Sequence, residues 1–191
     1  MILIIDNGSQ YTHLIKRNCR DLGFDSEIIP NKKTLSEVKN LTKNAEKIIL
    51  SGGPSSVTKG NNGLAEEILT KMIQKEESLP LLGICFGHQL IAHVFGGIVE
   101  KGKSAEYGLI KIEIDQEGVL FRGVPKEFSA WASHFDEVKK IPPSFTSLAH
   151  SELCEHEAMQ HVKRPIFSVQ FHPEVWHTEK GEQMLENFLK I

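Results

Sequence analysis

The sequence predicts an α/β fold, a mostly parallel open sheet with flanking helices and added antiparallel strands in the second half. Three observations lead to this class. Short apolar runs alternate with helical patterns over the first 96 residues. A glycine-flanked turn joins a strand pattern to a helix pattern at 83–87. Beyond residue 109, apolar and charged residues alternate as they do in half-exposed strands.

Short apolar runs in the first half have the length of buried strands. They cover residues 2–5, 27–29, 47–50 and 81–84, and turn residues follow the first three. Because helical patterns separate these runs, we expect parallel strands whose carboxyl ends meet at one edge of the sheet. This edge would collect Asp6, Gly52-Gly53 and Cys85. Asp6 also fits the simpler role of capping a turn.

Helices are expected over about 10–22, near 34–37 and over 63–76. Thr34 and Glu37 are spaced as a capping box, which predicts the start of the second helix. Gly23 ends the first helix. The apolar face of that helix consists of Tyr11, Leu14, Ile15, Cys19 and Leu22.

Segment 83–87, Gly-Ile-Cys-Phe-Gly, has the form of the nucleophile elbow Gly-x-Ser-x-Gly, with cysteine in place of serine. An apolar run precedes it, and apolar residues at helical spacing follow it up to Phe95. Cys85 would therefore begin a helix, where free N–H groups and the helix dipole stabilise a thiolate. A buried structural cysteine is the alternative that the pentapeptide alone leaves open.

The second half has the texture of antiparallel strands. Ile110, Ile112 and Ile114 alternate with charged residues. Further strands are expected near 127–131, 147–150 and 157–160 and over 166–171. Thr178 is expected to cap the last helix, whose apolar face contains Met184, Leu185, Phe188 and Leu189.

The strand over 166–171 ends in His172-Pro173-Glu174. Residues two apart on an extended chain share a side, and Pro173 favours extended geometry at His172. A carboxylate on one ring nitrogen leaves the other free to act as a base. If this strand lies beside the elbow strand, Cys85, His172 and Glu174 form a nucleophile, base and orienting acid. A solvated surface pair is the alternative for His172 and Glu174.

Composition narrows the class of protein. The chain has 191 residues, 40% of them hydrophobic and 25% charged, which suits one globular domain over 1–191. A net charge of −3 gives no basis for binding nucleic acid or an anionic membrane, and no apolar run is long enough to span a bilayer. Three widely separated cysteines make a disulfide framework unexpected, and a reducing cytoplasm is the expected location.

Together these residues resemble the triad-type (class I) glutamine amidotransferases, over nearly the whole chain. The family motifs appear in order as 51–54 (SGGP), 83–89 (GICFGHQ) and 170–174 (QFHPE). Within the family the chain is most similar to the amidotransferase subunits of GMP synthases. That likeness is carried by 6–11 (DNGSQY), 105–108 (AEYG), 131–136 (WASHFD) and 172–178 (HPEVWHT).

The resemblance implies a flavodoxin-like amidotransferase fold and a role for each matching residue. Cys85 would attack the carboxamide of L-glutamine, His172 would transfer protons and Glu174 would orient it. The backbone N–H groups of Gly53 and Phe86 would form the oxyanion hole. The glutamine pocket would be lined by Gln89, Ser133, His134 and Phe135.

The resemblance also implies a partner. Ammonia would pass to an ATP-pyrophosphatase subunit that uses ATP and Mg²⁺ to aminate xanthosine monophosphate (XMP) to GMP, with no cofactor or metal in this chain. A separate subunit is expected because no ATP-pyrophosphatase segment follows Ile191. The partner is expected to contact 106–107, 133–136 and 176–178 and to activate the glutaminase.

Other interpretations remain open at this level. The chain could serve another amidotransferase pathway of the anthranilate synthase type, hydrolyse γ-glutamyl compounds alone, or be a silent regulatory partner. Cys154, His156, Glu157 and His161 could hold a metal, although their spacing fits no standard zinc signature. Gly52-Gly53 lacks the remainder of a phosphate-binding loop.

Overall fold

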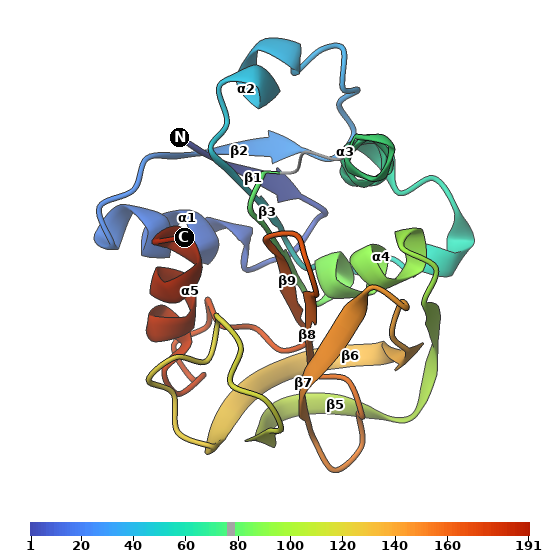
Figure 1. The fold of residues 1–191 in the computed structure, drawn as a ribbon, viewed down its shortest axis with the longest axis vertical. Coiled ribbons are helices and arrows are strands. Elements are labelled where there is room, and N and C mark those ends of the chain that lie inside the picture. Colours follow the sequence, from blue (N-terminus) through green and yellow to red (C-terminus); the bar gives the residue numbers. More distant parts are fainter. Residues whose placement is uncertain (76–78) are drawn as a thin grey trace.

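The computed structural model describes residues 1–75 and 79–191, and its element order confirms the α/β class (Figure 1). The helix expected over 63–76 is present as α3, and its expected last residue, Glu76, lies outside the described residues. The helices are α1 (Thr12–Asp21), α2 (Lys39–Lys43), α3 (Gly63–Gln74), α4 (Phe86–Val94) and α5 (Gly181–Leu189), with a 3-10 turn η1 (Val57–Lys59).

The strands form one mixed sheet in the order β2-β1-β3-β4-β9-β8-β7-β5-β6. Their bounds are β1 (Ile2–Asp6), β2 (Ser26–Pro30), β3 (Lys47–Leu50), β4 (Leu81–Ile84), β5 (Ile98–Ile114), β6 (Glu127–Lys140), β7 (Phe145–His150), β8 (Ala158–His161) and β9 (Ile166–Val169).

The sheet is parallel from β2 to β9 and antiparallel from β9 to β6, as the two textures of the sequence predict. The last parallel strand, β9, comes from the second half of the chain. It pairs directly with the elbow strand β4, so that Gly83 lies opposite Ser168 and Ile84 opposite Val169. This pairing is the condition that the predicted triad required.

Alternate residues of the parallel strands enter two separate cores, one on each face of the sheet. On β1, Ile2 and Ile4 pack in the core that includes residues of α1 and α5. Leu3 and Ile5 pack in the other core, with residues of α3 and α4. Figure 1 shows α1 and α5 on one side of the sheet and α3 and α4 on the other. Burial on both faces explains why these strands are continuously apolar.

Three local expectations need correction. The short strands expected near 110–114 and 127–131 belong to a long hairpin, because the polar residues before and after them continue the β5–β6 pairing. The capping box forms, with the Thr34 amide donating to Glu37 Oε2 at 2.8 Å, but it closes a turn and α2 begins only at Lys39. Thr178 does not cap α5: that helix begins after Lys180, and no side chain caps it.

Thr178 instead helps to close the sheet. After β9, the chain turns back along β6, where the His172 amide donates to Trp131 O at 2.9 Å and the Glu179 amide to Ser129 O at 2.9 Å. Between them, Thr178 Oγ1 accepts a hydrogen bond from the Trp131 amide at 2.9 Å and donates one to His172 O at 2.7 Å. Segment 172–179 therefore occupies hydrogen-bonding positions along β6.

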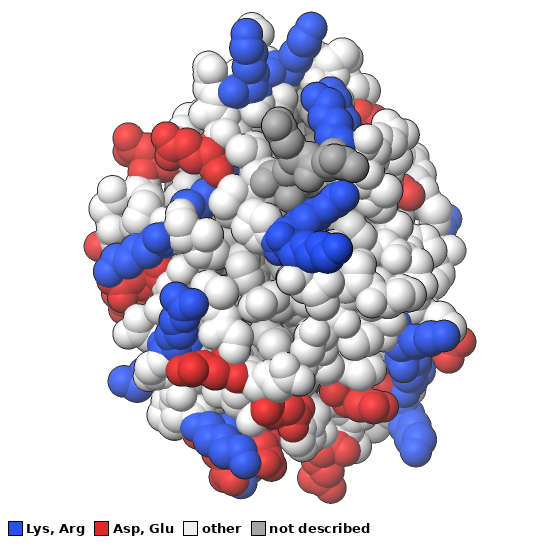
Figure 2. All heavy atoms as spheres, in the orientation of Figure 1, with Lys and Arg blue, Asp and Glu red and all other residues white. Residues whose placement is uncertain are grey.

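Acidic and basic side chains are interspersed on the face drawn in Figure 2. This distribution agrees with the small net charge of −3. Over the described residues, no helix combines the length and apolarity that crossing a membrane requires.

Candidate active site

The candidate site lies where the parallel strands β1, β3, β4 and β9 end. Each strand is followed there by polar or small residues, and β6 approaches from the antiparallel half. Asp6, at the end of β1, has the simpler of its two expected roles. Its Oδ1 accepts hydrogen bonds from the Gly8 amide at 2.9 Å and from Thr12 Oγ1 at 2.8 Å, which fixes the turn into α1.

Cys85 occupies the tight turn between β4 and α4. It stands immediately before the first residue of α4, at φ +52° and ψ −103°, a conformation that costs an L-residue on the order of 1–3 kcal/mol. Its two flanking glycines permit the close packing around it. A Cβ on Gly83 would lie 2.6 Å from the Gly87 carbonyl oxygen, and one on Gly87 would lie 2.5 Å from the Leu50 carbonyl oxygen. The predicted elbow geometry is confirmed.

His172 and Glu174 form a buried pair beside this turn. His172 Nδ1 donates a hydrogen bond to Glu174 Oε1 at 2.8 Å, and both side chains are almost fully buried. Burial by itself lowers the pKa of His172, but the charge of Glu174 and the neighbouring Cys85 raise it well above the usual value. The surface-pair alternative for these two residues is therefore wrong.

The glycine loop after β3 approaches the same site. A Cβ on Gly52 would lie 3.0 Å from His172 Cε1 and 3.5 Å from Cys85 Cβ. A Cβ on Gly53 would lie 2.6 Å from the Asn7 carbonyl oxygen, so only glycine fits there. Within the described residues, neither the Gly53 nor the Phe86 amide donates a hydrogen bond to protein. These two amides remain the predicted oxyanion donors.

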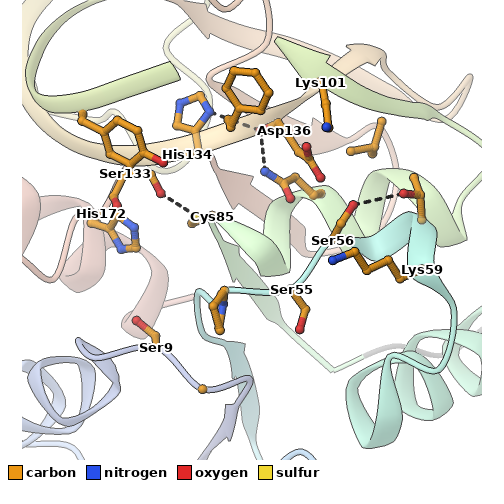
Figure 3. Close-up of a pocket in the computed structure, with 18 of the residues that line it drawn as sticks. Ser9, Ser55, Ser56, Lys59, Cys85, Lys101, Ser133, His134, Asp136 and His172 are labelled. Atoms are coloured by element: carbon orange, nitrogen blue, oxygen red, sulfur yellow. Dashed lines mark hydrogen bonds between the residues drawn. The ribbon is translucent and has the colours of Figure 1, made fainter. Parts of the chain in front are cut away.

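A cavity of about 960 Å³ opens over Cys85. Figure 3 shows Cys85 between His172 and Ser133 on one side and Ser56 and Lys59 on the other. Six other predicted site residues line the cavity with Cys85, namely Gly53, Gln89, Ser133, His134, Phe135 and His172. The remaining two, Phe86 and Glu174, are buried and do not line the cavity. Their predicted roles do not require it, because Phe86 would act through its backbone amide and Glu174 through His172.

The predicted pocket residues differ in how freely they face the cavity. Cys85 Sγ lies 3.9 Å from the carbonyl oxygen of Ser133. Phe135 is 40% exposed. Gln89 is held by its own amide nitrogen, which donates to Asp136 O at 2.7 Å and to Gln170 Oε1 at 3.1 Å. Gln89 thus ties α4 to the strand that carries Ser133.

His134 also belongs to a buried acidic cluster behind the cavity. Its Nδ1 donates to Asp136 O at 3.2 Å, and its Nε2 lies 3.0 Å from Glu106 Oε2 and 3.9 Å from Glu157 Oε1. Burial, reinforced by the adjacent Glu106 carboxylate, raises the pKa of Glu157 well above its usual range. A protonated Glu157 lets two carboxyl groups lie together without a second charge.

The four metal-ligand candidates expected from the sequence do not converge. His156 Nδ1 bonds to Ser147 Oγ at 2.9 Å, and His161 Nδ1 accepts hydrogen bonds from the amides of Lys163 and Arg164. Among the described residues, Cys154 and Glu157 lie instead with Glu106, their ligand atoms within 4.8 Å of one another.

Tyr11 is a site residue whose position the sequence pattern misjudges. Helical spacing assigns Tyr11 to the apolar face of α1, but it precedes that helix and lines the cavity. Its ring meets His172 edge to face, with the ring centroids 5.0 Å apart. Its position after a strand-end turn is the sequence signal that could have identified it.

The arrangement can perform nucleophilic catalysis at a carbonyl carbon. A cysteine at a helix N-terminus faces an open cavity, with a histidine beside it and a carboxylate on the far ring nitrogen. Two free backbone amides are available to stabilise an oxyanion.

Comparison with known proteins agrees with this chemistry. The family model described as "Glutamine amidotransferase class-I" matches residues 3–191. Two proteins named as a subunit of glutamine-hydrolysing GMP synthase, from Pyrococcus abyssi and Methanocaldococcus jannaschii, are 51% and 49% identical to this chain. Both matches cover all of this chain and 98% and 97% of those relatives. A crystal structure from Thermoplasma acidophilum, described as "a putative gmp synthase subunit a protein", superposes with a TM-score of 0.86 at 36% identity, covering 99% of this chain and 92% of that one.

Proposed function

This chain belongs to the class-I glutamine amidotransferases, and from that premise we propose that it is the glutamine-hydrolysing subunit of a GMP synthase. One observation carries the chemical part of the proposal: Cys85 on its elbow lies beside the His172–Glu174 pair, across neighbouring strands β4 and β9. The pathway is supported by two relatives, 51% and 49% identical and matched over 98% and 97% of their length, whose names make them subunits of a glutamine-hydrolysing GMP synthase.

In the proposed first half-reaction, the Cys85 thiolate attacks the γ-carboxamide carbon of L-glutamine. The charge that develops on the carboxamide oxygen is stabilised by the Gly53 and Phe86 amides, each of which would be worth about 3 kcal/mol in the barrier. As the carbon–nitrogen bond breaks, His172 donates its proton to the leaving nitrogen, and ammonia departs. A γ-glutamyl thioester remains on Cys85. The Glu174 carboxylate favours the protonated His172 that this step consumes.

In the second half-reaction, the neutral His172 takes a proton from water as the water attacks the thioester carbon. The carbon–sulfur bond then breaks, which releases glutamate and restores the thiolate beside a protonated His172. Glu174 holds the same ring nitrogen throughout, so the other nitrogen serves both proton transfers.

The partner is part of the proposal. We propose that ammonia passes to a separate ATP-pyrophosphatase subunit, which binds ATP and Mg²⁺ and converts XMP to GMP. The relatives are named as one subunit of their synthase, which supports the existence of a second chain. The docking surface would be the rim of the cavity, where Tyr107 is 70% exposed, extended to Trp176, which is 83% exposed and stacks on His177. Large exposed aromatic side chains beside an active site suit interface anchors.

The test is to titrate the purified ATP-pyrophosphatase subunit, with ATP, Mg²⁺ and XMP, into this protein and to measure glutamate release. We expect a rise of about tenfold or more, equivalent to a coupling of about 1.4 kcal/mol. The matched control is Cys85→Ala in the same complex, which should lose glutamine-dependent GMP synthesis but retain synthesis from added ammonium chloride.

Two results would contradict this assignment. A glutaminase rate that is already maximal without a partner would indicate a stand-alone hydrolase. Activation by the large subunit of an anthranilate synthase, with none by the ATP-pyrophosphatase subunit, would place the chain in another amidotransferase pathway.

A further inference from the structure

We propose that Tyr11 and Trp131 are positioning residues for His172, and that they connect it to the exposed aromatic pair Trp176–His177. Through this chain of contacts, occupation of the outer surface would alter the orientation of the catalytic ring. The part that concerns a partner rests on the proposed function. The part that concerns Tyr11 and His172 rests on the contacts inside this chain.

The inner contact is between Tyr11 and His172. Their rings meet edge to face, at a centroid distance of 5.0 Å and an interplanar angle of 72°. Glu174 holds Nδ1 of the same imidazole, and Gly52 leaves room for its Cε1. A hydrogen bond at one nitrogen still allows the ring to tilt about that bond. The Tyr11 ring restricts this tilt, on which the approach of the other nitrogen to Cys85 depends.

Trp131 fixes Tyr11 and also contacts His172 through its backbone. Its Nε1 donates a hydrogen bond to the Tyr11 hydroxyl at 3.2 Å, and its carbonyl oxygen accepts one from the His172 amide at 2.9 Å. One residue therefore holds both the backbone of His172 and the ring that packs against its side chain. A shift of Trp131 would move both restraints together.

The outer contacts join Trp131 to the surface. Its indole stacks on His177 at a centroid distance of 4.9 Å and an angle of 28°, and the His177 ring centroid lies 3.6 Å from that of Trp176. Trp176 is 83% exposed. On the neighbouring strand, Leu109 pairs with Trp131 in register and is 59% exposed. The far end of the chain of contacts is therefore an open apolar surface.

This surface reaches the rim of the active-site cavity. Tyr107 and Ser133 are paired in register on β5 and β6, and both line the cavity. Leu109 and Trp131 pair two positions further along the same two strands, and residues two apart on a strand share a face of the sheet. Trp176 itself lines a separate groove beside α1 and α5, so the partner must extend beyond the cavity rim to contact it. Such a partner would bias His172 only if it binds the protein more tightly when the ring has one orientation than when it has another.

The positioning role of Tyr11 and Trp131 is tested with three variants of this protein, each in complex with the partner subunit. Tyr11→Leu removes the ring against His172, Tyr11→Phe keeps the ring but removes the hydroxyl, and Trp131→Phe removes the donor. We expect Tyr11→Leu to lower kcat for glutamate release about tenfold with a less than twofold change in KM, as loss of positioning does. The two phenylalanine variants should each cost about threefold, and their double variant no more than either alone.

NMR provides a readout that needs no substrate. In the ¹⁵N-labelled protein, the two-bond ¹H–¹⁵N correlations of His172 report its tautomer and its ring motion. We expect these signals to shift or broaden in Tyr11→Leu and to change less in Tyr11→Phe. Unchanged signals and an unchanged kcat in Tyr11→Leu would overturn the positioning role, whereas loss of the folded spectrum would show a purely structural one.

The connection to the surface is tested with Trp176→Ala. Glutamate release is measured at a saturating concentration of the partner subunit, so that weaker binding of the partner does not affect the result. We expect the maximal activation to fall about fivefold in Trp176→Ala, and to stay unchanged in Val162→Ala, a change at an exposed apolar site outside the proposed surface. An undiminished maximal activation in Trp176→Ala would refute the surface connection. If the wild-type protein releases no glutamate with its partner, the proposed function itself fails, and the NMR comparison still decides the role of Tyr11.

Discussion

The three cysteines of this chain occupy different environments, although all are buried and free. Burial raises the pKa of Cys19 to about 11 and raises that of Cys154 further. Both are therefore neutral thiols near pH 7. Cys85 differs because it lines an open cavity beside His172, at the start of a helix. A reactive cysteine must be accessible to its substrate and lie beside groups that assist it, and of these three Cys85 has that setting.

The first prediction is therefore site-selective alkylation. A diazo-ketone analogue of glutamine should add once to the native protein, at Cys85 and at neither Cys19 nor Cys154. Peptide mass spectrometry after digestion locates the adduct. The Cys85→Ala variant serves as the control and should take up no label. An adduct on Cys154 in the native protein would show that Cys85 is not the nucleophile.

The second prediction concerns the pH dependence that Glu174 creates. The Glu174 charge raises the pKa of His172, so Glu174→Gln should lower it while keeping an oxygen acceptor for Nδ1. His172 then loses its proton at a lower pH, and the alkaline limb of kcat/KM should move to lower pH. We expect kcat itself to fall about a hundredfold, more than KM rises, because the proton transfers lose their support.

The control for this experiment is Glu179→Gln, a change at the carboxylate that accepts a hydrogen bond from the exposed backbone of Ser129. Its profile should match that of the native protein. An unshifted alkaline limb in Glu174→Gln would mean that another group sets the pH dependence.

At the scale of elements, the elbow between β4 and α4 combines strain and close packing. The positive φ of Cys85 places its side chain at the cavity, and the glycines on either side permit contact with β3 and α4. The Cys85 side chain is 5% exposed and packs at the edge of the core, and it also lines the cavity. The strained conformation is thus retained where the chemistry needs it.

The third prediction follows from this strain. Glycine adopts positive φ without the penalty of an L-residue, so Cys85→Gly should be more stable than Cys85→Ala by about 1 kcal/mol. The control position is His93, an exposed site in the helix that Cys85 precedes. There the His93→Ala variant should be more stable than His93→Gly by about 1 kcal/mol, as is usual within a helix. Urea unfolding measures both differences. The same order at both positions would show that the turn is unstrained in solution.

At the scale of the whole molecule, the chain returns to the site from its far end. Strand β9 enters the parallel half beside β4, and segment 172–179 then runs along β6. This return brings together β4 from the first half, the triad residues after β9 and the cavity residues of β6. The site therefore depends on long-range pairing as much as on the elbow.

The fourth prediction tests that return. Thr178→Val keeps the shape of the side chain but removes the hydroxyl that accepts from the Trp131 amide and donates to His172 O. Leaving these groups unpaired should cost about 1–3 kcal/mol of unfolding free energy. Thr42→Val is the control at a half-buried threonine of α2, whose hydroxyl donates only within its own helix, to Lys39 O, and it should change stability by less than about 0.5 kcal/mol. Equal stability of the two variants would exclude a closing role for Thr178.

The sequence by itself determined the strands of the parallel half, the helices α1, α3 and α4, the elbow and the spacing of the His172–Glu174 pair. These features depend on local rules: apolar runs, glycine positions and residue spacing along an extended chain. The triad also requires that β9 pair with β4, and local rules do not establish which strands pair. The predicted pocket residues followed from resemblance, and the structure places them around one cavity.

Only the tertiary structure decided the full length of the β5–β6 hairpin, the later start of α2, the closing role of Thr178 and the place of Tyr11 beside His172. Apart from the start of α2, where a Thr34–Glu37 turn closes locally, each of these depends on partners far away in the sequence. Thr178 has the side chain of a helix cap, yet its hydroxyl bonds to Trp131 and His172, because segment 172–179 must satisfy the backbone groups along β6. Tyr11 has helical spacing, but the turn after β1 turns its ring toward a histidine 161 positions later, and only the closed sheet brings the two together.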